Sequence, residues 1–252
     1  MSPSDRLRST VVVTGASRGF GAAIAAALVG RGHRVVGVAR TAEALAQVHR
    51  ELGSAFIPVV ADATAAVTAR TLIEQYQPKV LVLNAGAMPG IGPVHEQTWE
   101  SFSRNWQVDT QHVFHWIQAA LRQPLPPGSL VVAMSSGAAV GGSPLSGGYS
   151  GAKAMIRFLA GYAADESSRA ELGIGFVSVL PQLTPATELG AAGVAAYAGR
   201  RGVDAATFAA AFAPLLTPAR VGSEIAQLCQ DAGGQDEHRV YQLSGHGLHA
   251  LA

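Results

Sequence analysis

Short apolar runs and amphipathic stretches alternate along almost the whole chain. The apolar runs stay apolar at successive positions, which is typical of strands buried on both faces of a parallel sheet. They predict strands at residues 10–13, 34–38, 55–60, 79–83, 130–134, 176–180 and 239–243. Between them, apolar side chains recur at helical spacing, as at Phe20, Ile24 and Leu28. This spacing predicts a helix that ends at residues 30–32 and further helices at 41–52, 64–76, 98–123, 148–172 and 222–231.

The regular alternation of strand and helix predicts an α/β fold. We expect a Rossmann-like, doubly wound parallel sheet with helices on both faces, formed by residues 1–252 as a single domain. Residues 182–218, rich in Ala, Gly, Thr and Pro, interrupt the pattern and are expected to be irregular. A long irregular segment in a compact domain usually has a function. It is therefore predicted to be a substrate lid, with a solvated surface insertion as the alternative.

Composition narrows the possible partners. The chain carries 18 Lys and Arg against 17 Asp and Glu, so charge gives no reason to expect a nucleic acid or an anionic membrane as a partner. A single cysteine, Cys229, excludes an internal disulfide framework and a Cys-rich zinc site. The histidines lack metal-ligand spacing, so no metal is expected. No leader is visible at the start and no apolar run reaches the ~18 residues of a membrane span, so we expect a cytoplasmic protein.

A glycine-rich turn follows the first predicted strand, at the edge where doubly wound sheets bind ligands. It contains Gly15, Ser17, Arg18, Gly19, Phe20 and Gly21. Gly15 permits a tight turn, Gly19 lets the backbone approach a pyrophosphate, and Gly21 lets the helix pack on the strand. The free N–H groups and the dipole at the helix start favour an anion. The turn therefore predicts a dinucleotide site, although glycines also occur in ordinary turns.

Residues after the second, third and fourth strands indicate which nucleotide binds. An NAD site places a carboxylate after the second strand for the ribose 2′-hydroxyl, but this chain has Arg40 there. With Arg18, Arg40 can bind a 2′-phosphate; the alternative is that both are solvated surface residues. Asp62 can accept a hydrogen bond from the adenine amino group, cap the helix near Thr64, or do both. The small residues of Asn84-Ala85-Gly86 leave room for a ribose.

The candidate catalytic residues are Ser136, Tyr149 and Lys153. Tyr149 and Lys153 are four residues apart near the start of a predicted helix and therefore lie one turn apart on one face. An ammonium group near a phenol stabilises the phenolate, which makes Tyr149 a candidate general acid or base. Ser136, just after a strand, can hydrogen-bond a reacting carbonyl. Tyr and Lys at this spacing are also common on helix surfaces by chance.

Together these features resemble the short-chain dehydrogenase/reductase family over nearly the whole chain. Residues 14–21 are similar to its T-G-x-x-x-G-x-G turn, and residues 84–86 to its N-A-G motif. Ser136 stands 13 residues before Tyr149, and Tyr149 with Lys153 matches the family's Y-x-x-x-K. The order of these motifs and their places at strand ends make the resemblance specific.

The resemblance implies NAD(P)(H)-dependent reduction of a carbonyl or oxidation of an alcohol. In this interpretation Tyr149 is the proton donor or acceptor, Lys153 also binds the nicotinamide ribose, and Ser136 orients the substrate. Basic residues placed like Arg18 and Arg40 accompany a preference for NADP(H). The resemblance further implies that helices 98–123 and 148–172 pair between subunits of a homodimer or homotetramer.

The chain departs from the family at Asp109. The family usually has an Asn within a V-N-x-x-x-x-F context, as part of a proton relay, whereas residues 108–114 here read V-D-T-Q-H-V-F. Asp109 keeps the oxygen acceptors and loses the amide donor. We therefore keep Asp109 among the catalytic candidates and expect a retuned or weakened relay. A buried carboxylate at this position is also expected to attract Lys153.

A second departure follows the sixth strand. The usual P-G is Pro181-Gln182 here, and Thr184 and Thr187 are both candidates to bind the nicotinamide carboxamide together with Pro181. Apolar and small residues around the expected pocket favour a neutral, hydrophobic ketone or aldehyde. Arg200 and Arg201 instead allow an acidic group.

The sequence therefore predicts an NADP(H)-dependent oxidoreductase acting on a small carbonyl or alcohol. One alternative is a regulator or redox sensor that keeps the fold and binds NADP(H) without turnover. Only Asp109 and Gln182 support this alternative. Another is a related lyase or epimerase that uses the same Ser136, Tyr149 and Lys153 without a net change in the cofactor.

Overall fold

The computed structural model describes residues 9–231 and 239–251 of the chain. Within them a single eight-stranded sheet has the order β3-β2-β1-β4-β5-β6-β7-β8. Strands β1 to β7 pair in parallel, and β8 runs antiparallel to β7 at one edge. The strands are β1 (Thr10–Thr14), β2 (Arg34–Ala39), β3 (Phe56–Val60), β4 (Val80–Leu83), β5 (Leu130–Met134), β6 (Gly175–Pro181), β7 (Val240–Ser244) and β8 (Gly247–Ala250). The predicted fold class is confirmed.

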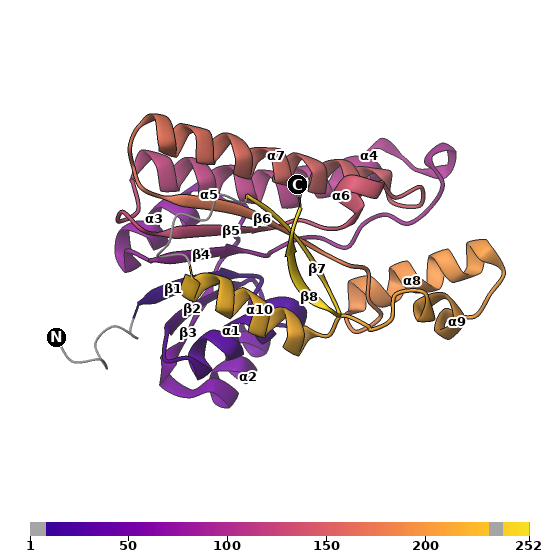
Figure 1. The fold of residues 1–252 in the computed structure, drawn as a ribbon, viewed down its shortest axis with the longest axis horizontal. Coiled ribbons are helices and arrows are strands. Elements are labelled where there is room, and N and C mark those ends of the chain that lie inside the picture. Colours follow the sequence, from indigo (N-terminus) through magenta and orange to yellow (C-terminus); the bar gives the residue numbers. More distant parts are fainter. Residues whose placement is uncertain (1–8, 232–238, 252) are drawn as a thin grey trace.

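Helices cover both faces of the sheet, and two of them project beyond it (Figure 1). They are α1 (Gly19–Gly30), α2 (Ala42–Leu52), α3 (Ala66–Tyr76), α4 (Trp99–Asn105), α5 (Gln111–Arg122), α6 (Ala138–Gly141), α7 (Gly147–Arg169), α8 (Glu188–Arg201), α9 (Ala205–Ala210) and α10 (Pro218–Asp231). Short 3₁₀ turns lie at Gly53–Ala55 and Val94–Glu96. All seven predicted strands are present, each with its bounds shifted by no more than one residue.

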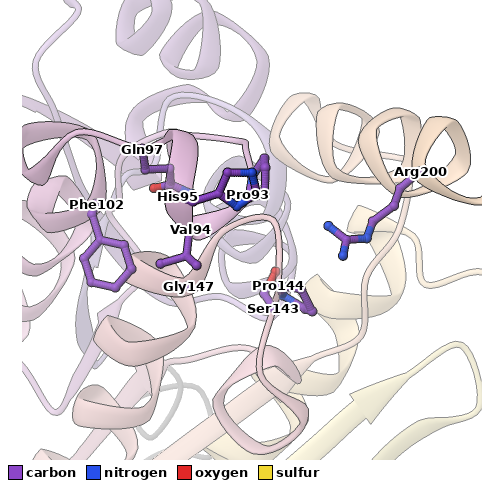
Figure 2. A pocket seen from close by; sticks show the side chains of 9 residues that line it. All are labelled: Pro93, Val94, His95, Gln97, Phe102, Ser143, Pro144, Gly147 and Arg200. Carbon is purple, nitrogen blue, oxygen red and sulfur yellow. The ribbon is translucent and has the colours of Figure 1, made fainter.

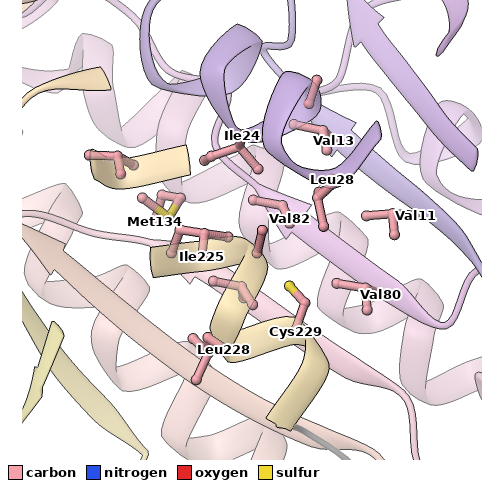
Figure 3. Close-up of a cluster of buried hydrophobic side chains, with 14 of the residues drawn as sticks. Val11, Val13, Ile24, Leu28, Val80, Val82, Met134, Ile225, Leu228 and Cys229 are labelled. Atoms are coloured by element: carbon pink, nitrogen blue, oxygen red, sulfur yellow. The ribbon is translucent and has the colours of Figure 1, made fainter. Parts of the chain in front are cut away.

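The two faces of the sheet carry separate hydrophobic cores. Side chains alternate across a strand, so Val11 and Val13 of β1 face one layer and Val12 faces the other. The first core packs the sheet against α1, α2 and α10, with Ile24 and Leu28 at its centre (Figure 3). The second packs it against α3, α5 and α7. This double burial explains the nearly continuous apolar strands, and it leaves the carboxyl ends of the strands to form the site.

The predicted helix over residues 98–123 is present, but it contains a π-helical turn that was not predicted. The structure has α4, then a π-helical segment at Trp106–Thr110, then α5. Asp109 is buried in the widened turn, and its carboxylate accepts a hydrogen bond from the Ala87 N–H at 2.8 Å. A single widened turn leaves the apolar spacing on either side almost unchanged, so hydrophobic periodicity did not reveal it.

The expectation that residues 182–218 are irregular is also wrong, because the segment contains α8 and α9. Each helix begins at a side-chain cap: Thr187 accepts from the Gly190 N–H at 3.1 Å, and Asp204 accepts from the Thr207 N–H at 2.8 Å. Val194 and Phe208 anchor a small third core between the two helices. Alanine favours helix strongly enough to offset the scattered glycines that suggested a loop.

Two smaller differences lie near the carboxyl terminus. Helix α10 begins at Pro218, earlier than predicted, because Thr217 caps it by accepting the Arg220 N–H at 3.2 Å and proline suits the first helical turn. Strand β8 was not predicted, since its four residues carry no alternating apolar pattern. Within residues 9–231 and 239–251, none of the helices has the length and apolar character that crossing a membrane requires.

Candidate active site

The glycine-rich turn joins β1 to α1 in a tightly packed arrangement. Gly15 and Gly19 have positive φ angles of 66° and 56°, which glycine adopts without strain. A Cβ on Gly21 would lie 2.1 Å from the Gly15 carbonyl oxygen, so only glycine fits there. A Cβ on Gly19 would meet nothing nearer than Thr187 Cγ2 at 3.9 Å. The turn is therefore closed toward the protein at Gly21 and open at Gly19, as the approach of a pyrophosphate requires.

The Asn84-Ala85-Gly86 segment fixes this turn from the side. Thr14 Oγ1 accepts hydrogen bonds from the backbone N–H groups of Asn84 (2.9 Å) and Ala85 (3.1 Å). The Asn84 amide donates to the Thr14 carbonyl oxygen at 3.2 Å. A Cβ on Gly15 would lie 2.9 Å from Ala85 Cα, so the two segments are in van der Waals contact. The side chain of Asn84 thus stabilises the backbone of the glycine-rich turn at the predicted cofactor site.

Three charged residues were predicted to bind the adenosine end of the cofactor. Arg40 is exposed just after β2. Asp62 Oδ1 accepts from the Thr64 N–H at 2.9 Å, and this bond chiefly, with the charge of Arg40 a smaller cause, lowers the pKa of Asp62. Asp62 therefore makes a local turn with Thr64, but it does not cap α3, which begins at Ala66 without a side-chain cap. Arg18 stands at the start of α1 and forms an exposed ion pair with Glu188 of α8.

The structure brings Tyr149 and Lys153 together and places Ser136 after the neighbouring strand. Both Tyr149 and Lys153 belong to α7, and Lys153 Nζ lies 5.6 Å from the centroid of the Tyr149 ring. Lys153 Nζ also donates to the Met134 carbonyl oxygen at 3.2 Å, at the end of β5. Ser136 is half-buried, and its Oγ accepts from the Ala138 N–H at 3.2 Å. The predicted proton donor thus has a cation beside its ring.

The predicted attraction between Asp109 and Lys153 is confirmed as a buried ion pair. Lys153 Nζ lies 3.2 Å from Asp109 Oδ2, and the two side chains are 8% and 0% exposed. Burial alone lowers the pKa of Lys153, but the charge of the Asp109 carboxylate, with Tyr149 and a hydrogen bond to Asp109, outweighs it and raises that pKa. Lys153 is accordingly protonated, so a full positive charge is held beside Tyr149.

Pro181 ends β6, and its carbonyl oxygen accepts from the Gly137 N–H at 2.9 Å. The two threonine candidates beyond it occupy different places. Thr184 is buried, and its hydroxyl donates to the Leu216 carbonyl oxygen at 2.6 Å. Thr187 caps α8 and lies beside Gly19. Contact of Pro181 and Thr184 with a cofactor stays a prediction, and of the two threonines Thr187 is the one at the glycine-rich turn.

Neither Asn105 nor His112 was singled out in the sequence analysis. Asn105, 1% exposed, donates to the Ala87 carbonyl oxygen at 2.9 Å and to Asp109 Oδ1 at 3.4 Å. Its signal was available: a polar residue four positions before Asp109 on the same helix face. His112 is fully buried, and burial followed by the charge of Lys153 lowers its pKa to about 3. His112 is therefore neutral, and among the described residues no group of three or more His, Cys, Asp or Glu side chains is placed to hold a metal.

A cavity of about 350 Å³ opens beside Gly147 at the start of α7, and neither Ser136 nor Tyr149 is among its lining residues. Its wall is mostly apolar, with Arg200 of α8 on one side (Figure 2). The Arg200 side chain reaches from its helix toward Ser143 and Pro144. Arg201 instead lies over the Phe208 ring, 5.0 Å from its centroid. The lining is Pro93, Val94, His95, Gln97, Phe102, Ser143, Pro144, Gly147 and Arg200.

Comparison with known families agrees with this geometry. The model of the short-chain dehydrogenase family matches residues 9–196, which include the glycine-rich turn, Asn84, Ser136, Tyr149 and Lys153. The chain belongs to the short-chain dehydrogenase family.

Individual relatives match parts of the chain. Over 99 residues it is 40% identical to a probable NADP-dependent dehydrogenase of Haemophilus influenzae, covering 36% of this chain and 39% of that protein. Over 166 residues it is 36% identical to versicolorin reductase 1 of Aspergillus parasiticus, covering 62% of this chain and 63% of that protein. These two relatives are each matched over less than two thirds of their length.

Solved structures match over nearly the full length. A crystal structure of a putative NAD(P)-dependent gluconate 5-dehydrogenase from Beutenbergia cavernae, with bound NADP, has a TM-score of 0.79 at 25% identity and covers 94% of this chain and 95% of that chain. A 3-ketoacyl-(acyl-carrier-protein) reductase from Brucella melitensis, complexed with NADH, has a TM-score of 0.78 at 21% identity, with 95% and 98% covered. The second likeness concerns the fold.

Proposed function

We propose that this protein is an NADP(H)-dependent oxidoreductase that reduces a carbonyl group, or oxidises the corresponding alcohol, with Tyr149 as general acid or base. The observation that carries the proposal is the Lys153 ammonium, held by Asp109 and the end of β5 at 5.6 Å from the Tyr149 ring centroid. The family and the NADP named for the Haemophilus and Beutenbergia proteins support the cofactor.

The residues present suit a dinucleotide. The open backbone at Gly19 and the start of α1 would hold the pyrophosphate, because N–H groups at a helix N-terminus favour anions. Arg40, with Arg18, would bind the 2′-phosphate, and Asn84-Ala85-Gly86 would border the ribose. When bound, the cofactor supplies the hydride.

The protein's own residues would then handle the proton. Ser136 Oγ orients the substrate carbonyl, and the Tyr149 hydroxyl donates its proton to the carbonyl oxygen as the alcohol forms. Lys153 stabilises the phenolate left behind, until solvent reprotonates it. In the oxidative direction Tyr149 accepts the alcohol proton instead.

The direct test is NADPH oxidation, followed at the nicotinamide absorbance, with a panel of ketones and aldehydes. Turnover of any carbonyl with loss of NADPH supports the proposal. NADPH binding without turnover of any panel member would favour the regulator or redox sensor. Substrate conversion without a net absorbance change would favour the lyase or epimerase.

Cofactor choice gives the first prediction. Arg40→Ala is expected to raise the NADPH dissociation constant at least ~10-fold, since a charge-assisted hydrogen bond to phosphate contributes roughly 1.5–3 kcal/mol. The NADH dissociation constant should stay nearly unchanged, because NADH lacks the 2′-phosphate. Fluorescence titration of both nucleotides measures the effect.

Arg34→Ala is the matched control for Arg40→Ala, because Arg34 is exposed at the opposite end of the same strand, β2. It should alter neither affinity. Equal affinities of the wild type for NADPH and NADH would contradict the assignment of Arg40, as would a parallel weakening of both nucleotides by Arg40→Ala.

We propose that helix α8 acts as the predicted lid. At its start, Glu188 pairs with Arg18 of the glycine-rich turn. Further along, the Tyr197 hydroxyl lies 2.6 Å from Ser143 Oγ and accepts from the Leu145 N–H at 3.3 Å. One helix thus contacts both the cofactor turn and the loop that borders the cavity, so its position would couple the two.

The contrast between Arg200 and Arg201 gives a second prediction, about the substrate. Arg200 faces the cavity, whereas Arg201 is stacked on Phe208, so the wall supports an apolar substrate with one acidic group. For a matched pair of carbonyls, an acid and its methyl ester or amide, Arg200→Gln should lower kcat/KM for the acid roughly 10-fold or more by raising KM. The neutral partner should be little affected.

Arg201→Gln is the control for Arg200→Gln, since it removes the same charge outside the cavity. It should leave the ratio of kcat/KM between acid and neutral substrate at the wild-type value. If Arg200→Gln also leaves that ratio unchanged, the substrate carries no acidic group near this wall.

A third prediction concerns assembly. The outer surfaces of the π-helical segment, α5 and α7 expose large aromatic side chains, and two of them, Phe158 and Tyr162, stack on each other with centroids 6.2 Å apart. We propose that these helices pair between subunits in a homodimer or homotetramer. Phe158→Glu should shift the sedimentation coefficient toward that of the monomer, because it places a charge in an apolar interface.

Val67→Glu is the control for Phe158→Glu. Val67 is also exposed, but it lies on α3 outside the proposed interface, so the assembly should be retained. A wild-type protein that sediments as a monomer at micromolar concentration would contradict the proposed pairing.

A further inference from the structure

The two carboxylate oxygens of Asp109 contact different partners. Oδ1 accepts from the Ala87 N–H at 2.8 Å and from the Asn105 amide at 3.4 Å. Oδ2 faces Lys153 Nζ at 3.2 Å. Gly86 closes the remaining side, since a Cβ there would lie 2.9 Å from Oδ2. The carboxylate is therefore held in one orientation, with Oδ2 directed at the ammonium.

Asn105 is the residue that completes this arrangement. It is 1% exposed and ends α4, one turn before Asp109. Its amide bridges the Ala87 carbonyl oxygen, at 2.9 Å, and Asp109 Oδ1. Ala87 is thus bound through its N–H by Asp109 and through its carbonyl by Asn105. An apolar side chain at 105 would leave the Ala87 carbonyl without this donor and would remove one of the two N–H donors to Asp109 Oδ1.

We propose that Asn105 is a positioning residue that holds Asp109 against Lys153, so that the cation beside Tyr149 is one half of a neutral ion pair and oxidation needs a higher pH than it would beside a free ammonium. This inference rests on the proposed function and adds its pH dependence. It also bears on the departure from the family's usual Asn, because residue 109 carries a charge in this chain and has the amide of Asn105 beside it.

The physical reason is electrostatic. A free ammonium stabilises the phenolate form of a neighbouring tyrosine, whereas a carboxylate 3.2 Å from that ammonium offsets much of its field. Among the described residues, Asp109 and Tyr149 are the charged groups that act on Lys153; His112 of α5 is neutral, and β5 contributes the Met134 carbonyl. The phenolate that oxidation requires therefore gains less from this cation than it would gain beside a free ammonium. Reduction needs the protonated phenol as acid, and oxidation needs the phenolate as base.

The atoms balance without a further reactant. In reduction, the carbonyl carbon gains the hydride and its oxygen gains the Tyr149 proton, which gives the alcohol and the oxidised cofactor. The Tyr149 phenolate then regains a proton from solvent. Lys153 and Asp109 keep their charges throughout.

The test is the pH–rate profile of Asp109→Asn and Asn105→Leu, measured for reduction and oxidation of one substrate pair. In Asp109→Asn the midpoint of the oxidative profile should fall by at least about one pH unit, since an unopposed cation within about 4–6 Å has an effect of that size. Asn105→Leu should also lower the midpoint of the oxidative profile. The double variant, Asn105→Leu with Asp109→Asn, should lower this midpoint no further than Asp109→Asn alone. Ser103→Ala, another buried polar residue of α4, is the control and should cause no shift.

A fall in melting temperature of Asn105→Leu without a shift of the midpoint would mean that Asn105 is only structural and would overturn its assignment. If Asn105→Leu does not fold, an unmoved midpoint in Asp109→Asn alone overturns the proposal. A second readout does not need turnover. The absorbance of tyrosinate is titrated against pH for each variant and for the same variant carrying Tyr149→Phe. The difference between the two titrations reports the ionisation of Tyr149 alone. A downward shift there in a protein that turns over no carbonyl would support the ion-pair proposal and contradict the proposed function.

Discussion

Tyr149→Phe is expected to lower kcat for carbonyl reduction at least ~100-fold, because a positioned proton donor contributes roughly 10²–10⁴-fold to the rate. The substitution removes only the hydroxyl. The ring that lies 5.6 Å from Lys153 Nζ is retained, so the packing at the start of α7 should persist. NADPH affinity should barely change, since the phenol is assigned no contact with phosphate.

Turnover and NADPH fluorescence titration, measured on the same preparation, separate the two effects of Tyr149→Phe. Tyr76→Phe, at the end of α3, is the control and should behave like the wild type. Near wild-type turnover of Tyr149→Phe would show that another group supplies the proton. A joint loss of binding and turnover would make Tyr149 a structural residue.

Lys153→Met is expected to abolish measurable turnover and to reduce the free energy of unfolding by about 3–5 kcal/mol. That is the usual result of removing one partner from a buried ion pair, and Asp109 is 0% exposed. Without the cation, the Asp109 carboxylate must stay unpaired or take up a proton. Urea unfolding measures the first effect and the NADPH assay the second.

The double variant Lys153→Met with Asp109→Asn separates stability from catalysis. It replaces the unpaired carboxylate with a neutral amide that still offers an oxygen to the Ala87 N–H, so most of the lost stability should return. Turnover should not return, because no cation remains beside Tyr149. If Lys153→Met alone is as stable as the wild type, the ion pair contributes nothing to folding.

The sheet and the position of the site were predictable because their signals are local. Strands buried on both faces read as unbroken apolar runs, and the residues after them, such as Gly15 and Ser136, must collect at one edge of a parallel sheet. The attraction between Asp109 and Lys153 was also predictable, since a carboxylate buried near a lysine has few other partners.

The features that were not predicted depend on contacts between distant segments. The π-helical turn is tied to Asp109 reaching the Ala87 N–H, which lies 22 residues earlier in the chain. The position of α8 depends on contacts of Glu188 with Arg18 and of Tyr197 with Ser143. The sequence around Glu188 and Tyr197 gives no indication of these distant partners. Asn105 was overlooked because a polar residue on a helix is ordinarily solvated, whereas this one is buried by the chain before α4.

The most direct test of the central claim is hydride transfer itself. NADPH carrying deuterium at the transferable position of the nicotinamide is incubated with the protein and a carbonyl that it turns over, and the product is examined by mass spectrometry. The account predicts an alcohol that carries one deuterium on the former carbonyl carbon and an unlabelled hydroxyl proton, which comes from solvent through Tyr149. A product without deuterium on carbon, or NADPH that binds and is never oxidised with any carbonyl, would contradict it.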